Sequence, residues 1–216
     1  MSLLIAPTLL DQFNWFKKCP ESWKEKAYQD IKNTLERVPF EPNEAIQKGM
    51  QFEKLVYQNA HNEHLRKMLT SKGASDLFIK VCEKVKFYAF YRKGKKKIII
   101  EGKEYLLYGR YDCYSQNKII DIKTTANFKR NSYLEKWQHK FYCYIEGIKD
   151  FEYLVIEWKD AENDDYSIKE IHSVVYEAND FNLIEKEIVE AIKEFISFVE
   201  KDKILKDAYY NKYNLY

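Results

Sequence analysis

The region from residue 81 to residue 125 carries the clearest strand pattern in the chain. It is rich in β-branched and aromatic residues, and turn-forming sequences such as "RKGKKK", "EGKE" and "SQNK" interrupt it. Residues of the first kind favour strands, and short turns of the second kind favour antiparallel pairing. The pattern therefore predicts an antiparallel meander of four stretches, "VCEKVKFYAFYRK", "KKIIIEG", "KEYLLYGRYDCYS" and "NKIIDIKTT".

Helical periodicity surrounds this meander. Apolar residues at helical spacing predict a short helix that Thr8 caps and that Cys19-Pro20 ends. This order of elements predicts an α/β (α+β) fold in which a central mixed β-sheet is flanked by helices. The remaining predicted elements are a long helix over 43–69, a helix over 131–147 that Asn131 or Ser132 caps and Gly147 ends, strands over 151–158 and 167–177, and a helix over 180–203.

Composition is typical of one globular domain. The 216 residues are 45% hydrophobic and 32% charged, and their 36 basic and 34 acidic residues nearly balance, so any basic surface must be local. No stretch approaches the roughly 20 apolar residues of a membrane span, and no basic leader opens the chain, so we expect a cytoplasmic protein with no membrane partner. Its 4 cysteines are scattered without a C-x-x-C pair, which favours reduced thiols over a zinc site or a disulfide framework.

The triplet acid-x-Lys occurs four times, and geometry separates the copies. On a strand, residues two apart point to the same face, whereas on a helix they lie roughly 200° apart. Asp30-Ile31-Lys32 falls in a helix-like stretch and Glu101-Gly102-Lys103 in an expected hairpin turn, so neither holds its acid and lysine together rigidly. Glu157-Trp158-Lys159 at a strand end has only Asp150 as an upstream acidic companion, and it stays a minor candidate.

Asp121-Ile122-Lys123 differs because a second acid is within reach. Asp112 lies in "GRYD" on the preceding predicted strand, across a short turn at Gln116-Asn117. Cross-strand neighbours are about 5 Å apart, so the two carboxylates can converge at one sheet edge. Hard oxygen ligands without His or Cys favour Mg²⁺ or Mn²⁺ over zinc, and with Lys123 they are the parts of metal-assisted phosphodiester hydrolysis. The alternative is a pair of strand-end charges that Lys123 only neutralises.

Four separated pieces of the chain occur in a fixed order. They are "KGMQFEKLV" with Gly49 and Glu53, "GRYD", "IIDIKTT", and "WQHKFYCY" with Gln138 and Tyr142. This combination resembles the PD-(D/E)XK nuclease superfamily, in its RecB-like and lambda-type phage exonuclease branch. The stretch "TLLDQFNWFKKCPESW" also resembles the amino-terminal helix of that branch. The resemblance spans roughly residues 8 to 146 and implies a restriction-endonuclease-like core.

The resemblance implies a metal centre. Asp112, Asp121 and the backbone carbonyl of Ile122 would bind Mg²⁺ or Mn²⁺, and Glu53 would complete the site or hold a second ion. Some members of this branch carry an iron–sulfur cluster on one amino-terminal cysteine and three cysteines close together near the carboxyl end. No cysteine follows Cys143, so no iron–sulfur cluster is expected.

The resemblance also assigns roles outside the metal ligands. Lys123 would orient or activate the attacking water and offset charge on the phosphorus. Gln138 and Tyr142 are one helical turn apart, so both could reach the site or the bound strand, with helix packing as the alternative. Basic residues that could grip a DNA backbone, or simply solvate turns and hairpin tips, are Lys95, Lys96, Lys97, Lys129 and Arg130.

These patterns together predict a metal-dependent deoxyribonuclease in one domain over 1–216. Its core motifs fall within 44–147, its C-terminal strands and helix within 151–203, and an aromatic tail within 204–216. The resemblance favours an exonuclease of phage or mobile-element recombination and repair that acts on DNA, with a single-strand annealing protein and a homo-oligomer as further expected partners. The alternatives are an endonuclease, a CRISPR-adaptation-like trimming nuclease without the cluster, and a non-catalytic nucleic-acid-binding module. Convergent carboxylates repel one another without a metal, which argues against the last.

Overall fold

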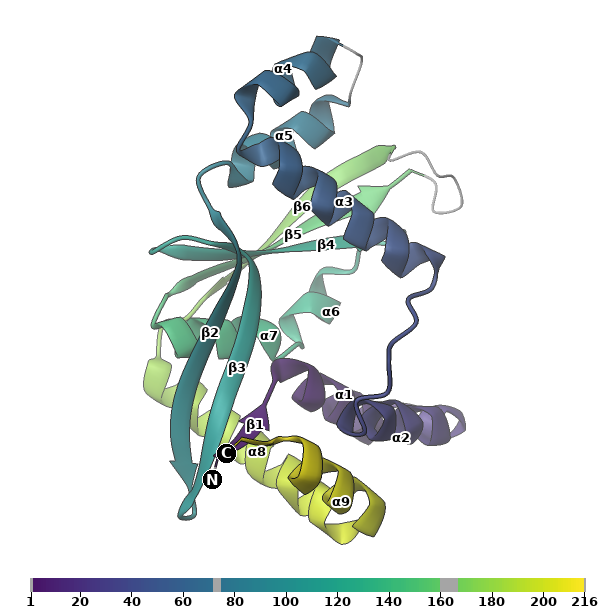
Figure 1. Ribbon diagram of the computed structural model, residues 1–216, viewed down its shortest axis with the longest axis vertical. Helices are drawn as coiled ribbons and strands as arrows, with labels where there is room; N and C mark the ends of the chain where they lie inside the picture. The colour runs from purple at the N-terminus through teal and green to yellow at the C-terminus, as the bar shows by residue number, and fades with distance from the viewer. Residues whose placement is uncertain (1, 72–74, 160–166, 216) are drawn as a thin grey trace.

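A computed structural model describes residues 2–71, 75–159 and 167–215 (Figure 1). Within these residues, one mixed sheet has the strand order β6-β5-β4-β3-β1-β7, and β2 pairs with β3 outside this path. β4 runs parallel to β5 and β1 runs parallel to β3, whereas the other pairs are antiparallel. The strands are β1 (Ser2–Ile5), β2 (Ala89–Ile100), β3 (Lys103–Tyr114), β4 (Lys118–Thr125), β5 (Asp150–Trp158), β6 (Ile168–Glu177) and β7 (Asn214–Leu215).

Helices cover both faces of this sheet, which confirms the predicted fold class. Figure 1 shows α3, α4 and α5 on one side and α1, α7 and α8 on the other. Each side has its own buried apolar cluster, one around Phe52 of α3 and one around Phe141 of α7. The helices are α1 (Pro7–Lys18), α2 (Glu21–Leu35), α3 (Glu44–Ala60), α4 (Glu63–Ser71), α5 (Asp76–Val85), α6 (Arg130–Leu134), α7 (Gln138–Glu146), α8 (Phe181–Lys201) and α9 (Lys203–Lys212).

Strand β3 changes partner along one of its edges. One edge pairs with β2 at every residue of β3 except Asp112. The other edge pairs with β1 at residues 104–107 and with β4 only at Cys113 and Tyr114. In the described part of the chain, residues 108–112 therefore have no strand partner on that edge. We call this interval the sheet gap, and it coincides with "GRYD".

The side-chain alternation of β3 also breaks at the sheet gap. Tyr111 packs in the apolar cluster of α7, whereas Cys113, two residues later, packs in the cluster of α3. In a regular strand, residues two apart would face the same side. The strand thus turns at Asp112, which lies between the two layers.

The predicted meander has three strands rather than four. The stretch "VCEKV" belongs to α5, because Val81, Cys82 and Val85 lie on one buried helical face. "RKGKKK" is no turn, since it lies within β2, and the hairpin turns instead at Glu101-Gly102. Lysines are tolerated in β2 because several of their side chains point to solvent along a strand at the margin of the sheet.

Two predicted helices are each divided. The helix expected over 43–69 breaks after Ala60, because the side chain of Asn62 accepts the backbone N–H of Leu65 and begins α4. The helix expected over 131–147 forms α6 and α7. Its predicted end at Gly147 is confirmed, and β5, β6 and α8 confirm the three later predicted elements.

Both ends of the described chain join the sheet. β1 was not predicted, and it lies parallel to β3, with Leu3 and Ile5 buried. Helix α1 then begins at Pro7, so Thr8 is not its cap; proline suits the first helical position because it lacks an N–H. The aromatic tail forms α9, which buries Tyr209, and β7, which pairs with β1.

Two expectations from composition concern membranes and cysteines. Within the described residues, no helix is both long and apolar enough to cross a membrane. The four cysteines carry free, buried thiols and lie in different parts of the fold: Cys19 after α1, Cys82 in α5, Cys113 in β3 and Cys143 in α7.

Candidate active site

Asp112 and Asp121 lie where β3 and β4 separate. The ladder between these strands ends at the Cys113–Ile120 pair, and the next residues in that register are Asp112 and Asp121. Instead of a backbone pair, Oδ2 of Asp112 accepts the backbone N–H of Ile122 at 2.9 Å. The side chain of Asp121 is only 1% exposed. The structure thus brings the two carboxylates together at the sheet gap.

Lys123 lies beside Asp121 on the same face of β4. Its Nζ is 2.6 Å from Oδ2 of Asp121, as expected for residues two apart on a strand. Burial alone would lower the pKa of Lys123, but the charges of Asp121 and Asp112 outweigh it and raise that pKa above its ordinary value. Lys123 is therefore a charged hydrogen-bond donor to Asp121.

Gln138 and Tyr142 bridge the two strands across the sheet gap. Nε2 of Gln138 donates to Oδ1 of Asp121 at 2.6 Å and to the hydroxyl of Tyr142 at 3.1 Å. The Tyr142 hydroxyl in turn donates to the backbone carbonyl of Arg110 at 2.9 Å. A Cβ on Gly109 would lie 2.7 Å from the Tyr142 ring, so the glycine of "GRYD" leaves room for this tyrosine. The bridge replaces the strand partner that β3 lacks there.

Glu53 reaches the same place from α3. One turn earlier, a Cβ on Gly49 would lie 2.6 Å from Oγ1 of Thr124, so glycine lets α3 approach β4 closely. The Glu53 carboxylate forms a hydrogen bond with the hydroxyl of Tyr91. Burial raises the pKa of Glu53, and the charge of Asp121 adds to this despite the Tyr91 hydrogen bond.

The charge balance of these carboxylates fits a divalent cation. Burial raises the pKa of Asp112 well above its ordinary value, and the charges of Asp121 and Glu53 raise it further, although Lys123 opposes them. Three acids thus share one lysine, and the raised pKa values of Asp112 and Glu53 reflect the cost of burying charged carboxylates beside one another. Carboxylates and a nearby backbone carbonyl are the ligands that Mg²⁺ and Mn²⁺ prefer.

Asp11 of α1 supports this site and was missed from the sequence. Its Oδ1 accepts the backbone N–H of Trp137 at 2.7 Å, at the start of α7, so it fixes the helix that carries Gln138. Burial raises the pKa of Asp11, and the charge of Lys123 acts against this rise, which places α1 close to the site. The sequence feature that could have indicated it is a single acidic residue among the apolar residues of "TLLDQF".

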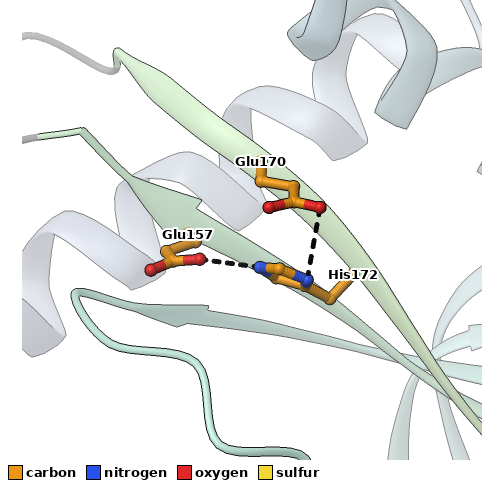
Figure 2. Close-up of side chains that lie close together, drawn as sticks. All are labelled: Glu157, Glu170 and His172. Carbon is orange, nitrogen blue, oxygen red and sulfur yellow. Dashed lines mark hydrogen bonds and ion pairs between the residues drawn. The ribbon is translucent and has the colours of Figure 1, made fainter.

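A second cluster of metal-type ligands lies at the far end of β5 and β6. Figure 2 shows Glu157, Glu170 and His172, which in the described residues form the one such group whose ligand atoms all lie within 4.8 Å of one another. Oε2 of Glu157 is 2.7 Å from Nε2 of His172, and Oε1 of Glu170 is 3.8 Å from its Nδ1. From the sequence, only the Glu157 triplet was a candidate. Glu170 and His172 lie two residues apart in "KEIH" on the facing strand, and this spacing could have indicated them as partners of Glu157.

The second cluster is arranged as an ion-pair network. The two carboxylates lie against opposite nitrogens of one imidazole, and these nitrogens cannot both point at one ion. Lys169 lies 2.9 Å from Glu157, and Phe128 stacks on the His172 ring at 3.8 Å. Lys169 and His172 lower the pKa of Glu157 through their hydrogen bonds to it. Both oxygens of Glu157 therefore already have a hydrogen-bonded partner, Lys169 for one and His172 for the other.

The predicted DNA-contacting residues are scattered. Lys96 donates to the carbonyl of Tyr144 at 3.0 Å and lies 3.5 Å from the centre of its ring, and Lys97 pairs with Glu104. Lys96 thus packs within the fold, whereas Lys97 forms an exposed ion pair. The remaining three are also exposed: Lys95 in β2, Lys129 just before α6 and Arg130 as the first residue of α6.

The two rejected acid-x-Lys triplets lie where the sequence placed them. Asp30 and Lys32 lie on α2, so their side chains diverge. Glu101 lies in the β2–β3 turn and pairs with Lys193 instead of Lys103. Neither triplet has a second carboxylate of the kind that Asp112 supplies to Asp121.

No family model matches this chain, and no curated protein matches it. Among solved structures, the alignment with SSO0001 covers 92% of this chain and 77% of SSO0001. The two are 16% identical, with a TM-score of 0.43. The alignment with a phage-related exonuclease from Haemophilus somnus 129PT covers 93% of this chain and 96% of the exonuclease, with 14% identity and a TM-score of 0.44. The alignment with the alkaline exonuclease LHK-Exo from Laribacter hongkongensis covers 91% of this chain and 90% of LHK-Exo, with 12% identity and a TM-score of 0.46. These similarities are distant, so a functional proposal has to rest on the side chains described above.

Proposed function

We propose that this chain is a metal-dependent nuclease that hydrolyses phosphodiester bonds in DNA. One observation carries the proposal: Asp112 and Asp121 converge at the sheet gap with a charged Lys123 against Asp121. Burying like charges side by side costs stability, and a cation bound between them offsets that cost. The motif resemblance points to the same residues.

The metal would be held by Asp112, Asp121 and the backbone carbonyl of Ile122, with Glu53 completing the site or holding a second ion. When bound, Mg²⁺ or Mn²⁺ supplies a Lewis acid for a phosphate oxygen and lowers the pKa of a bound water. No iron–sulfur cluster takes part in this proposal. The residues themselves would orient the phosphate and withdraw it from bulk solvent.

Lys123 would donate a hydrogen bond to a phosphate oxygen or to the attacking water. Its positive charge would offset the negative charge that grows on the phosphate oxygens as the bond breaks. Gln138 would hold Asp121 in position, and Tyr142 would act through Gln138, because its own hydroxyl is committed to the β3 backbone.

Within this class, the motif resemblance favours an exonuclease of phage or mobile-element recombination and repair. Such an enzyme degrades one strand and leaves single-stranded ends, so a single-strand annealing protein is the partner that we propose. Lys129 and Arg130 are exposed just after β4 and could contact the DNA backbone.

End-labelled linear DNA and covalently closed circles test the proposal, each with Mg²⁺, Mn²⁺ or EDTA. We expect wild type to degrade linear DNA only with metal and to spare closed circles, and we expect Asp121→Ala and Lys123→Ala to lose the activity. Metal-dependent degradation that survives in both variants would refute the site assignment. Cutting of closed circles would make the enzyme an endonuclease, and DNA binding without cleavage under any condition would leave only a binding module.

A further inference from the structure

Tyr91 has an unusual backbone conformation for a residue within a strand. Its φ is +56°, a left-handed value that side chains other than glycine seldom adopt. The two other positive-φ residues of this kind in the described chain, Arg37 and Glu101, follow a helix and lie in a hairpin turn. Such a conformation carries an energetic cost and persists only where the surrounding structure enforces it.

The conformation of Tyr91 turns two neighbouring rings toward α3. Phe90 and Tyr91 both contact Tyr57 of α3, with ring centroids at 4.9 Å and 5.3 Å. In a regular strand, consecutive side chains point to opposite faces. Phe90 pairs with Cys113 and Arg92 pairs with Tyr111. The register therefore places Tyr91 opposite Asp112. The strained residue therefore lies directly beside the candidate active site.

The Tyr91 side chain contacts a charged group at each of its two ends. Its hydroxyl forms a hydrogen bond with the Glu53 carboxylate. Its ring lies under the guanidinium of Arg110, 4.6 Å from the ring centre. Arg110 comes two residues before Asp112 on β3, and Tyr142 fixes its backbone carbonyl. Tyr91 thus joins α3 to the sheet gap.

Arg110 is arranged to bind an anion. It is exposed, and it forms no ion pair within the parts of the chain that the structure describes. A guanidinium that stacks on an aromatic ring keeps its N–H donors free at its edges, where they suit a phosphate. By contrast, Arg92 on the neighbouring strand lies 3.2 Å from Glu146 and 3.8 Å from the centre of the Tyr114 ring, so its charge is already paired.

We propose that Arg110 binds a phosphate group of the DNA strand beside the candidate metal site, and that Tyr91 positions both Arg110 and Glu53. The inference deepens the proposed nuclease function and rests on it for the identity of the ligand. The inference explains the strained backbone of Tyr91, because this conformation directs the side chain to both Glu53 and Arg110.

DNA binding in EDTA tests the phosphate contact without any cleavage. A fluorescently labelled duplex with a single-stranded end is titrated with wild type, Arg110→Ala and Arg92→Ala over a range of salt concentrations. We expect Arg110→Ala to weaken binding about tenfold and to reduce the slope of log K against log salt by about one. Arg92→Ala should bind as wild type does. Equal binding by wild type and Arg110→Ala would overturn the proposal.

Kinetics separate the inference from the proposed function. If wild type cleaves DNA, Arg110→Ala should mainly raise KM, since a phosphate contact away from the broken bond stabilises substrate and transition state alike. A fall in kcat with an unchanged KM would overturn the assigned role. If wild type does not cleave DNA at all, the proposed function fails, while the binding comparison in EDTA still decides the role of Arg110.

Two substitutions separate the roles of Tyr91. Tyr91→Phe keeps the ring and removes the hydroxyl, so DNA binding should stay unchanged while Mn²⁺ binding, measured by calorimetry, weakens. Tyr91→Gly accepts the positive φ without strain, so it should fold and should lose both Mn²⁺ affinity and DNA affinity. Unchanged Mn²⁺ binding in Tyr91→Phe would refute the positioning of Glu53, and unchanged DNA binding in Tyr91→Gly would refute that of Arg110.

Discussion

The sheet carries two clusters of acids with basic partners, and their charges are balanced in opposite ways. Glu157 pairs in register with Thr125 of β4, four residues beyond Asp121, so the clusters occupy different positions along the same strands. Around Glu157, Lys169 and His172 lower the pKa of the carboxylate. Around Asp112, burial and neighbouring acids raise the pKa. In the first cluster each oxygen of Glu157 has its own hydrogen-bond donor, whereas in the second three acids share Lys123.

This contrast shows why distance alone is a poor guide to a metal site. The ligand atoms of Glu157, Glu170 and His172 are the closer set in the described chain, yet a lysine and a ring nitrogen already satisfy the buried Glu157. The carboxylates at the sheet gap are less tightly gathered, and they repel one another. Burial and neighbouring acids raise the pKa of Asp112, and a cation bound beside it would offset the repulsion between these acids.

The largest expected difference between the clusters is in catalysis. We predict that Asp121→Asn lowers the rate of DNA cleavage by about 10³-fold or more, because it removes a metal ligand and the partner of Lys123. Glu157→Gln should leave the rate close to that of wild type. Initial rates on linear duplex with Mn²⁺ measure this, and circular dichroism checks that both variants are folded. If Glu157→Gln were as inactive as Asp121→Asn, the assignment of the chemistry to the Asp112–Asp121 cluster alone would be wrong.

The next difference is in stability against pH without metal. The pKa of Asp112 is raised in the folded chain from its ordinary value of 3.8, so its contribution to stability is present below that value and is lost as pH rises through the folded pKa. The pKa of Glu157 is lowered from 4.5, so its contribution is present above that value and is lost as pH falls. The two substitutions should therefore act in opposite directions at neutral pH.

Thermal unfolding at pH 7 in EDTA measures these opposite signs. We predict that Asp112→Asn raises Tm and Glu157→Gln lowers it, with each kcal/mol worth about 2–4 °C in a domain of this size. Added Mn²⁺ should raise the Tm of wild type and of Glu157→Gln, and it should leave Asp112→Asn unchanged. A higher Tm for Asp112→Asn that Mn²⁺ still increases would contradict the assignment of Asp112 as a ligand.

A smaller effect is expected from the contact between α3 and β4. Gly49→Ala should push α3 away from Thr124 and displace Glu53, which lowers the cleavage rate by about 10-fold to 100-fold. Thr124→Ala alone should be nearly silent, and combined with Gly49→Ala it should restore most of the rate, because the obstructing Oγ1 is gone. A double variant no faster than Gly49→Ala would show that the loss has another cause.

The local parts of the site could be predicted from the sequence. Asp121 and Lys123 follow from the two-residue period of a strand, and Gln138 and Tyr142 follow from one turn of helix, so their relative positions depend on a few residues each. The roles of Asp11, Tyr91 and Arg110 could not be predicted in this way. Each acts through a partner distant in sequence, and nothing near it in the chain indicates that partner.

The same distinction applies to the fold. The strands over 151–158 and 167–177 and the helix over 180–203 follow from continuous apolar patterns, and the structure confirms them. The lysine-rich "RKGKKK" resembles a turn, because its strand conformation depends on pairing with β3 along one edge. β1 is four residues long, and it pairs with β3 and β7, which lie far along the chain.

The position of β1 also sets an order of events during synthesis. Its first partner, β3, comes from the middle of the chain, and its second, β7, from the end of the described residues. Figure 1 shows the two ends side by side at this edge. Pairings between such distant segments form slowly, and β1 must wait for β3 and β7 to be synthesised before both of its edges are paired. A chain released before β7 is made would keep an open strand edge, which is a template for aggregation.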